Sequence, residues 1–447
     1  MPAPPSPFHV LRHHQSPLHH LAFSHSNDLL YSGDEDGNIA ITDLKLKRVI
    51  SSWKAHGEGV LGVGEWDGGL VSQGRDNVIH FHSPLETGSR SASASSSTSP
   101  PAKPSQPEPS TSSKPIVTTV STIPTITPLL PPPRILDSLP TNSLNFCKFA
   151  VVEVPEELGL TGEKMEMMSR KRRRPDGCPG LGSGRQGLLA VPNLMDSDSV
   201  DIYHLPTLTR LHAAFTHDPI PTISTPGTEG QNRTALIMGI HLYFYQDKLR
   251  TVLAFEDGRV ELWECDPWEL ETDIRLQKGN EGMWRCLWRE KGHNEAIMAM
   301  CVSPKLDFAF TVSADHQLVR YDLEKNQGGD TTRMKKHATK QIGNADVKVD
   351  STGKIVAVAG WDGSIRLFSV KSFKSLGTLA YHRDSCNTLV FPFNETGDRR
   401  AGEEDSDEEE FGTSSVGRAR KKAEGWLISG GKDRRIAIWQ LKDFARR

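Results

Sequence analysis

The chain has 447 residues, of which 36% are hydrophobic and 24% are charged, so it is long enough to bury the core of a large folded unit. Its formal net charge of −3 excludes a general attraction to nucleic acids or to anionic membranes. The start MPAPPSPFHVLRHH lacks the apolar core of a signal peptide, and no run of about 18 apolar residues occurs, so neither secretion nor a membrane span is expected.

Histidines surround the first predicted strand. His13, His14, His19 and His20 lie in HHQSPLHH, and imidazoles can bind zinc or copper. No cysteine or carboxylate completes a metal site there, and the six cysteines of the chain are scattered without metal-site spacing. We therefore expect no metal, no cofactor, and reduced thiols in a cytosolic or nuclear protein.

A hairpin pattern recurs along the chain. Each copy has an apolar run, a turn with Asp or Gly, and an alternating run, which is typical of two antiparallel strands joined by a short turn. The seven copies are residues 32–44, 72–82, 194–205, 254–264, 313–323, 360–368 and 429–441. A pattern that recurs in this way indicates architecture rather than chemistry.

A histidine precedes several of these turns at a nearly constant spacing. The pairs, separated by 20 to 22 residues, are His14 and Asp36, His56 and Asp76, and His293 and Asp315. A Ser or Thr often lies four residues before the Asp, as Ser72 does. With these residues the chain resembles the WD-repeat family of β-propellers, whose four-stranded units carry a histidine near the start and an aromatic residue near the end.

The resemblance implies a buried hydrogen-bonded network within a blade. Its members are His56, Ser72 and Asp76 in one blade, His293, Thr311, Asp315 and Tyr321 in a second, and His382, Ser429, Asp433 and Trp439 in a third. The same residue types would suit a Ser-His-Asp hydrolase, but a triad is needed once, and the sequence has no GxSxG nucleophile elbow. We interpret the residues as structural and predict no enzymatic activity.

Seven units of about 40 to 45 residues account for the chain outside its insertions. The last copy ends at Leu441, which leaves too few residues for a fourth strand. We therefore expect an all-β fold, a single seven-bladed WD-repeat β-propeller over residues 1–447. Its last blade would be closed by an N-terminal strand from residues 8–12, because a ring must not leave a bare strand edge.

Residues 84–134 form an insertion rich in Ser, Pro and Thr, and this composition predicts disorder. Two nearby segments could supply the outer strand of the second blade. One is KPIVTTVSTI within the insertion, and the other is RILDSL after it. The sequence leaves both possibilities open.

A basic insertion, residues 153–187, interrupts the first hairpin of blade three. It contains the run Arg170, Lys171, Arg172, Arg173 and Arg174. Such a run suggests a nuclear localisation signal, and the alternative is a solvated basic loop.

An acidic insertion, residues 395–424, interrupts the same hairpin of blade seven. Within its EEDSDEEE segment, Ser406 is a candidate phosphorylation site for an acid-directed kinase. Equivalent hairpins lie on one face of a propeller, so we predict that both charged insertions project from that face. The opposite face would then be free for a partner.

Three tryptophans follow the fourth hairpin. Trp284 and Trp288 are expected to pack between blades, because large aromatic side chains dominate core burial. Trp268, in the loop DPWELETDIRLQ, gives the only hint of an exposed tryptophan, and an exposed one there would be a candidate interface anchor.

The segments LPTNSLNFCKF, VAVAGWDGSIRLF and LISGGKDRRIAIWQL resemble a fungal family of ASTRA-associated WD-repeat proteins, which is similar to animal G-protein-β-like propellers. The resemblance implies a nuclear, non-enzymatic scaffold of the ASTRA complex, linked to chromatin regulation and to the maturation of phosphatidylinositol-kinase-like kinases. Its partners would be the other protein subunits and the associated kinase-chaperone machinery, without direct binding of nucleic acid or membrane.

Two other functions remain open. A signalling adaptor that resembles a G-protein β subunit would need an N-terminal helix to pair with a γ subunit, and MPAPPSPFHV is too short and too rich in proline for one. A substrate receptor of a ubiquitin ligase would carry a WD-x-Arg ending, and no blade has a convincing one.

Overall fold

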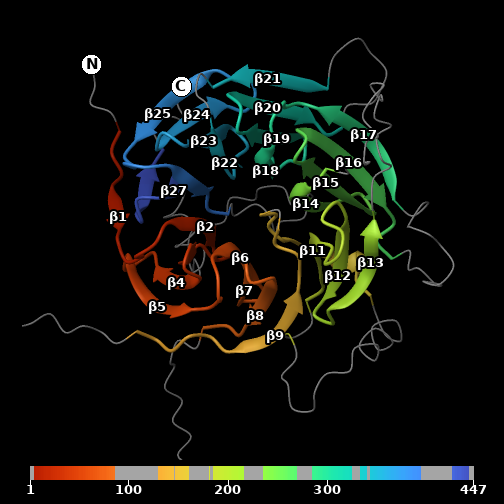
Figure 1. Cartoon of the computed structure of the whole chain (residues 1–447), viewed down its shortest axis with the longest axis horizontal. Coiled ribbons are helices and arrows are strands. Elements are labelled where there is room, and N and C mark those ends of the chain that lie inside the picture. The colour runs from red at the N-terminus through yellow and green to blue at the C-terminus, as the bar shows by residue number, and fades with distance from the viewer. Residues whose placement is uncertain are drawn as a thin grey trace, which may run out of the picture.

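Seven four-stranded antiparallel sheets follow one another around a ring in a computed structural model of the chain (Figure 1). The structure describes residues 5–85, 129–144, 146–160, 181, 185–215, 235–268, 284–324, 333–339, 343–393 and 425–441. Within these residues, no helix is long and apolar enough to cross a membrane. The expected seven-bladed β-propeller is therefore confirmed.

The strands of the first three blades are as follows. Blade one contains β2 (Leu18–Phe23), β3 (Leu29–Asp34), β4 (Asn38–Asp43) and β5 (Arg48–Lys54). Blade two contains β6 (Val60–Trp66), β7 (Gly69–Gly74), β8 (Val78–His82) and β9 (Ile135–Pro140). Blade three contains β10 (Ala150–Glu153), β11 (Gly187–Pro192), β12 (Val200–Leu205) and β13 (Thr209–Phe215), with the short 3-10 helix η1 (Glu156–Leu158) after β10.

The other four blades repeat this order. Blade four contains β14 (Ile237–Tyr245), β15 (Lys248–Phe255), β16 (Arg259–Cys265) and β17 (Arg285–Lys291). Blade five contains β18 (Ile297–Val302), β19 (Phe308–Ser313), β20 (Gln317–Asp322) and β21 (Met334–Ala338). Blade six contains β22 (Asn344–Val349), β23 (Ile355–Gly360), β24 (Ser364–Ser369) and β25 (Ser375–Ala380). Blade seven contains β26 (Cys386–Val390), β27 (Trp426–Gly431), β28 (Ile436–Gln440) and β1 (His9–Leu11).

The two ends of the chain close the ring together. Strand β1 pairs antiparallel with β28, with His9 opposite Ile438 and Leu11 opposite Ile436. Figure 1 shows the red start of the chain beside the blue last blade. The closure by residues 8–12 is confirmed, and it covers the edge that β28 would otherwise expose.

The outer strand of blade two comes from RILDSL, one of the two segments that the sequence offered for it. Strand β9 contains ILDSLP and pairs with β8, with Leu139 opposite Ile79. The segment KPIVTTVSTI lies outside the described residues, as does most of the low-complexity insertion.

The core consists of seven hydrophobic clusters, one at each interface between neighbouring blades of the described structure. Second strands such as β7, β11, β23 and β27 are buried at every position, because both of their faces pack against adjacent blades. At the closure, Leu11 of β1 packs with Leu18 of blade one and Trp426 of blade seven. No blade can therefore bury its apolar faces alone.

Turn glycines fix how a hairpin meets the loop that follows its blade. Gly37 has φ +86°, and the backbone N–H groups of Ala55 and His56 both donate to its carbonyl. Gly363 has a similar φ of +79°, and an added Cβ there would lie 2.6 Å from the carbonyl oxygen of His382. A side chain would be strained there both by the backbone conformation and by the lack of space.

Polar side chains join the innermost strands of neighbouring blades. His20 of blade one accepts a hydrogen bond from the N–H of Val63 at 3.0 Å, and Asn387 of blade seven donates to the carbonyl of Leu18 at 3.0 Å. These strands are the inner edges of their sheets, so their backbone groups need partners from outside the sheet. These two hydrogen bonds satisfy some of them, and His20 also lines the pocket at the centre of the ring.

Candidate functional site

The network of blade seven is a continuous chain of hydrogen bonds. Nδ1 of His382 lies 3.0 Å from Asp433, and Nε2 lies 2.8 Å from Oγ of Ser429. Trp439 Nε1 donates to the same Oγ at 2.9 Å. A carboxylate can only accept and an indole can only donate, so His382 donates to Asp433, and the Ser429 hydroxyl is free to donate to His382.

Blade two contains the same chain of bonds with a histidine in the aromatic position. His56 contacts Asp76 at 3.1 Å through Nδ1 and Ser72 at 2.9 Å through Nε2. Ser72 in turn contacts Nε2 of His82 at 3.0 Å. Burial lowers the pKa of His82 to about 4 and also lowers the pKa of His56, which Asp76 partly offsets, so both rings are neutral at pH 7.

In blade five, the structure brings His293 together with Asp315 at 2.9 Å and with Thr311 at 2.8 Å. Burial lowers the pKa of His293, although Asp315 opposes the shift. Tyr321 is fully buried, and its ring stacks on Trp288 of blade four, with the centroids 6.0 Å apart. The Tyr321 ring thus ties blade five to the preceding blade, although no hydrogen bond joins it to the described network.

In blade one, the pairing of His14 with Asp36 is wrong. Nδ1 of His14 contacts Asp34 at 2.8 Å and Nε2 contacts Ser32 at 2.7 Å, whereas Asp36 accepts a hydrogen bond from Ser16. Asp34 ends β3 and is 1% exposed, so it lies deeper in the blade than the turn residue. Burial alone would raise the pKa of Asp34, but hydrogen bonds from His14 and Asn38 lower it below the ordinary value.

Blades four and six use other contacts in place of this network. In blade four, Trp263 donates to the fully buried Glu261 at 2.8 Å, and Arg289 bonds the same carboxylate at 2.6 Å. In blade six, Val358 occupies the serine position, and Asp362 forms an ion pair with Arg366 at 2.8 Å. A turn aspartate without the serine therefore turns outward to a surface cation.

The burial of the hydroxyl groups determines what the networks can do chemically. Ser72, Thr311 and Ser429 are all 0% exposed. A nucleophile must reach a substrate atom, and these hydroxyls cannot do so in the folded protein. The arrangement stabilises the blades and does not form a catalytic triad.

The remaining candidate residues are placed as follows. The basic run at 170–174 and Ser406 lie outside the described residues. The expectation that Trp268 is an exposed anchor is wrong, because its Nε1 donates to the carbonyl of Leu158 at 2.7 Å and its ring packs against a core cluster. Trp284 and Trp288 are 6% and 5% exposed and lie in the clusters on the two sides of blade four.

The N-terminal histidines have separate roles. His14 belongs to the network of blade one, and His19 bonds the carbonyl of Val60 at 3.2 Å. His20 accepts from Val63, as described above. Among the residues that the structure describes, no group of three or more metal-ligating side chains gathers.

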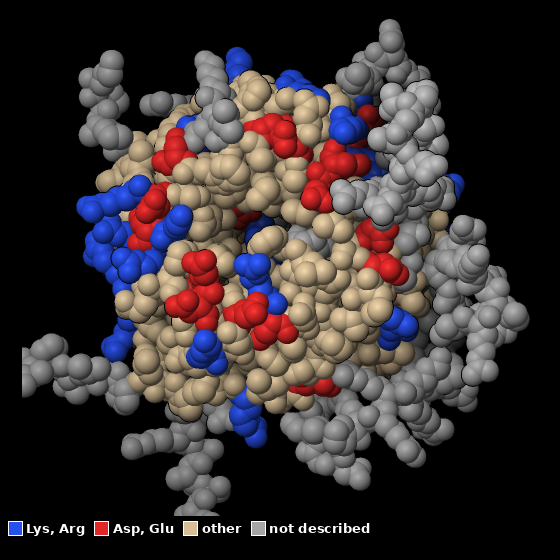
Figure 2. Space-filling view, viewed as in Figure 1, with Lys and Arg blue, Asp and Glu red and all other residues tan. Residues whose placement is uncertain are grey.

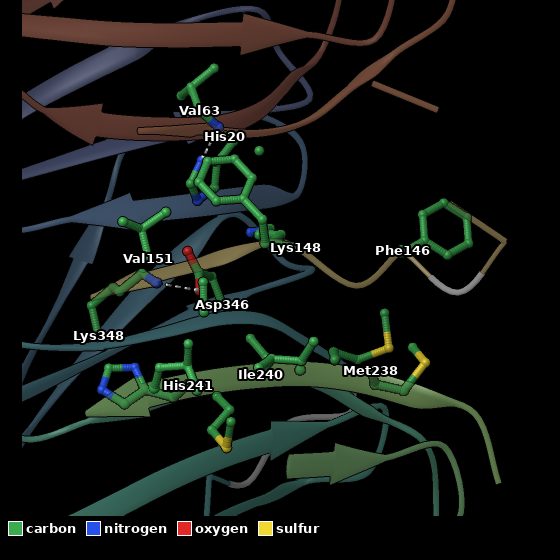
Figure 3. A pocket seen from close by; sticks show the side chains of 18 of the residues that line it. His20, Val63, Phe146, Lys148, Val151, Met238, Ile240, His241, Asp346 and Lys348 are labelled. Carbon is green, nitrogen blue, oxygen red and sulfur yellow. Dashed lines mark hydrogen bonds and ion pairs between the residues drawn. The ribbon is translucent and has the colours of Figure 1, made fainter. Parts of the chain in front are cut away.

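A pocket of about 400 Å³ occupies the centre of the ring (Figure 3). Innermost strands of six blades contribute to it, and Phe146, Met238 and Met298 line it at the ends where these strands begin. Phe393, which follows β26, lines it at the other end. Polar and apolar groups contribute about equally to its wall, so the pocket suits a ligand that carries both kinds of group.

The sequence reading missed the charged residues of this channel. Lys148, Asp346 and Lys348 line it, and Figure 3 shows their side chains around the same cavity. The signal was a lysine or an aspartate within a short apolar strand, as in FCKFAVV and NADVKV. Sequence alone does not say that both strands face one channel.

The face on which the innermost strands begin also carries the turns after each second strand. Over blade seven, this face presents exposed Arg383, Lys432 and Arg434, together with the half-buried Arg435. Figure 2 shows Lys and Arg side chains gathered in this part of the ring, beside β1 and β27. Asp384 is an exposed carboxylate in the same group of loops.

The charged insertions enter at the opposite ends of the innermost strands. The basic one follows β10 and η1 and precedes β11, and the acidic one follows β26 and precedes β27. Both positions are the first hairpin of a blade, so the hairpin ends lie on one face. That the inserted residues themselves project from this face stays a prediction.

Comparison with known families matches the repeats. A family model described as "WD domain, G-beta repeat" matches residues 5–43, 284–322 and 331–369. Each match begins at the outer strand of one blade and ends with the third strand of the next. The sequence repeat is therefore offset from the blade by one strand, which links consecutive blades.

Several curated relatives extend over almost the whole chain. The protein named ASTRA-associated protein 1 of Aspergillus niger is 28% identical over 98% of this chain and 97% of its own length. Its namesake in Verticillium alfalfae is 28% identical, with 99% and 94% covered. The mouse guanine nucleotide-binding protein subunit beta-like protein 1 is 24% identical, with 98% and 97% covered.

Proposed function

We propose, from the premise that this chain is a seven-bladed WD-repeat β-propeller, that it is a non-enzymatic scaffold subunit of the ASTRA complex. The observation that carries the proposal is its similarity, over nearly the full length of both chains, to proteins named ASTRA-associated protein 1. The buried network hydroxyls support a structural rather than a catalytic use of the Ser, His and Asp residues.

A finer role follows from the resemblance to the fungal family. The protein would contribute to chromatin regulation and to the maturation of phosphatidylinositol-kinase-like kinases by holding other subunits together. A rigid ring suits this task, because loops and faces fixed on a rigid framework bind partners without a large ordering cost.

We also place the protein in the nucleus. The basic run from Arg170 to Arg174 supports this placement by its composition. Imaging of the fluorescently tagged chain tests it, with a variant in which these five residues are replaced by Ala and Ser. Nuclear signal for the intact chain and cytoplasmic signal for the variant are expected, whereas equal cytoplasmic signal for both contradicts the placement.

Affinity purification of the tagged full chain, followed by mass spectrometry, tests the scaffold function. Recovery of proteins of the ASTRA assembly and of large kinase-chaperone components is expected. Recovery of a G-protein γ subunit or of a cullin adaptor in their place would show a different function. A chain with Trp439→Asp, which disrupts the core of blade seven, is the unfolded control.

A further inference from the structure

The central channel contains more positive than negative charge. Lys348 forms an ion pair with Asp346 at 3.8 Å. Both oxygens of Asp346 also accept backbone N–H groups, from Val347 at 2.9 Å and from Leu389 at 2.8 Å. Among the described residues, no carboxylate forms an ion pair with Lys148. The channel therefore has two ammonium groups and one carboxylate, and that carboxylate is already bound by Lys348 and two backbone N–H groups.

Lys148 is held in place by a neighbouring blade. Gln73 of β7 donates to the carbonyl of Cys147 at 3.1 Å and accepts from the N–H of Phe149 at 2.8 Å. Gln73 is 0% exposed, so the backbone on both sides of Lys148 is fixed by a buried amide. Figure 3 shows the lysine side chain directed into the cavity. The backbone that carries this ammonium group is therefore fixed before any ligand arrives.

The two histidines of the channel add no charge. Burial lowers the pKa of His241 to about 4 and the pKa of His20 well below its usual value. Nδ1 of His20 accepts from Val63, so its proton lies on Nε2, which remains a donor. Besides the carboxylate of Asp346, the polar side chains of the channel are therefore two ammonium groups and two neutral imidazoles.

The mouth of the channel adds an apolar rim. Phe146 is 52% exposed and Met298 is 39% exposed, and both line the pocket at the face that carries the cations of blade seven. Exposed apolar side chains next to the half-buried lysines of the channel fit a ligand that combines an acid with apolar groups.

We propose that this channel receives an acidic side chain from a partner protein, flanked by apolar residues that pack on Phe146, Met238 and Met298. The inference rests on the proposed scaffold function and names the chemistry of one partner contact. Lys148 would bind the carboxylate, and His20 would donate a second hydrogen bond. Acidic residues farther along the segment would meet Arg383, Lys432 and Arg434.

A carboxylate fits this channel better than a phosphate does. Among its described lining residues there is no arginine, and phosphate sites usually combine arginine with several backbone N–H donors. The apolar side chains at the mouth, Phe146, Met238 and Met298, also favour a peptide over a small, highly charged ion. Burial lowers the pKa of Lys148, which a bound carboxylate would counteract.

Selection from a random-peptide phage library on the folded full chain tests the proposal. The selected peptides are expected to be enriched in Asp or Glu next to Leu, Ile, Met or Phe. Their binding, measured by fluorescence anisotropy, should weaken at least about tenfold on Lys148→Met, because a charge-assisted hydrogen bond is lost. Lys371→Met, in a turn on the opposite face, is the matched control and should bind normally.

Thermal unfolding and calorimetry provide two further measurements that test the proposal. The thermal midpoint of Lys148→Met should not fall, since the variant removes a half-buried ammonium group that forms no ion pair with a described carboxylate. Enrichment of basic peptides, or equal binding by Lys148→Met, overturns the proposal. Isothermal titration calorimetry with inositol hexakisphosphate tests the phosphate alternative. Binding that is lost in Lys148→Met, together with no binding of acidic peptides, also overturns the proposal. If purification recovers ASTRA proteins and acidic peptides do not bind, the channel proposal is wrong and the scaffold function stands. If acidic peptides bind and no ASTRA proteins are recovered, the scaffold function is wrong and the channel proposal stands.

Discussion

Ser429 shows how a single hydroxyl connects two buried side chains at the residue scale. It joins His382 to Trp439, at 2.8 and 2.9 Å, and has no exposed surface. A buried polar atom that loses its partner keeps the desolvation cost without the hydrogen bond. One hydroxyl therefore keeps both an imidazole and an indole satisfied.

Ser429→Ala should consequently lower the free energy of unfolding by about 1 to 3 kcal/mol, because Nε2 of His382 and Nε1 of Trp439 both lose their hydrogen-bond partner. Urea denaturation followed by tryptophan fluorescence measures the change. Ser375→Ala, at an exposed position of β25, is the matched control and should change stability by less than about half a kcal/mol. Equal losses in the two variants would contradict the role of the network.

The buried histidines make the fold sensitive to acid. Burial lowers the pKa of His82, His204, His212 and His241 to about 4. Unfolded histidine has a pKa of about 6.5, so between about pH 6.5 and 4 the unfolded chain binds more protons than the folded chain. The free energy of unfolding should therefore fall as the pH falls through this window, by on the order of 1 kcal/mol per pH unit for each histidine at the steepest point.

Urea unfolding at a series of pH values between 8 and 4.5 checks this slope. His204→Gln should reduce it by about one proton, whereas replacement of the exposed His316 by Gln serves as the control. A pH-independent free energy of unfolding over the window, or an unchanged slope in His204→Gln, would show that the histidines are not neutral in the folded chain.

The residue types of the networks could be read from the sequence, but their partners could be read only in part. Constant spacing paired His56 with Asp76 and His293 with Asp315, and the structure shows these contacts. The same spacing failed for His14, because blade one uses the aspartate that ends β3. Lys148 was missed because its meaning depends on residues from other blades that meet only around the channel.

At the scale of elements, β1 has only three residues, yet it completes blade seven. It pairs with β28, Leu11 packs into the cluster between blades seven and one, and the ring of Phe8 lies 5.3 Å from that of Trp426. Removal of residues 1–11 should lower the thermal midpoint by several degrees and promote aggregation, because β28 becomes a bare edge. Differential scanning calorimetry and light scattering measure these effects.

A chain that begins at Ser6 keeps β1 and should melt like the full chain, which makes it the control for this deletion. An unchanged midpoint after removal of residues 1–11 would refute the closure as a stabilising element.

The need for such a strand was predictable from the sequence, since the last repeat ends at Leu441. The choice of β9 was not, because two segments had similar strand propensity and only packing against β8 decides between them.

At the scale of the whole molecule, the propeller separates two faces by chain connectivity. The innermost strands begin at the face with Phe146 and the cations of blade seven, and they end at the face where both charged insertions enter. The repeat pattern was enough to predict the ring and the hairpins that the insertions interrupt. The channel chemistry required the assembled ring.

This separation leads to a prediction about where partners bind. Replacement of residues 161–180 and 394–424 by short Gly-Ser linkers should change the free energy of unfolding by only about 1 kcal/mol, because β10 still pairs with β11 and β26 with β27, and loop length has a weak entropic effect. If partners bind the opposite face, affinity purification of this shortened chain should recover the same proteins as the full chain. The combined variant Arg383→Glu, Lys432→Glu and Arg434→Glu should lose them while its thermal midpoint stays unchanged. Loss of partners from the shortened chain, with the charge-reversed chain still binding, would place the interface on the insertions.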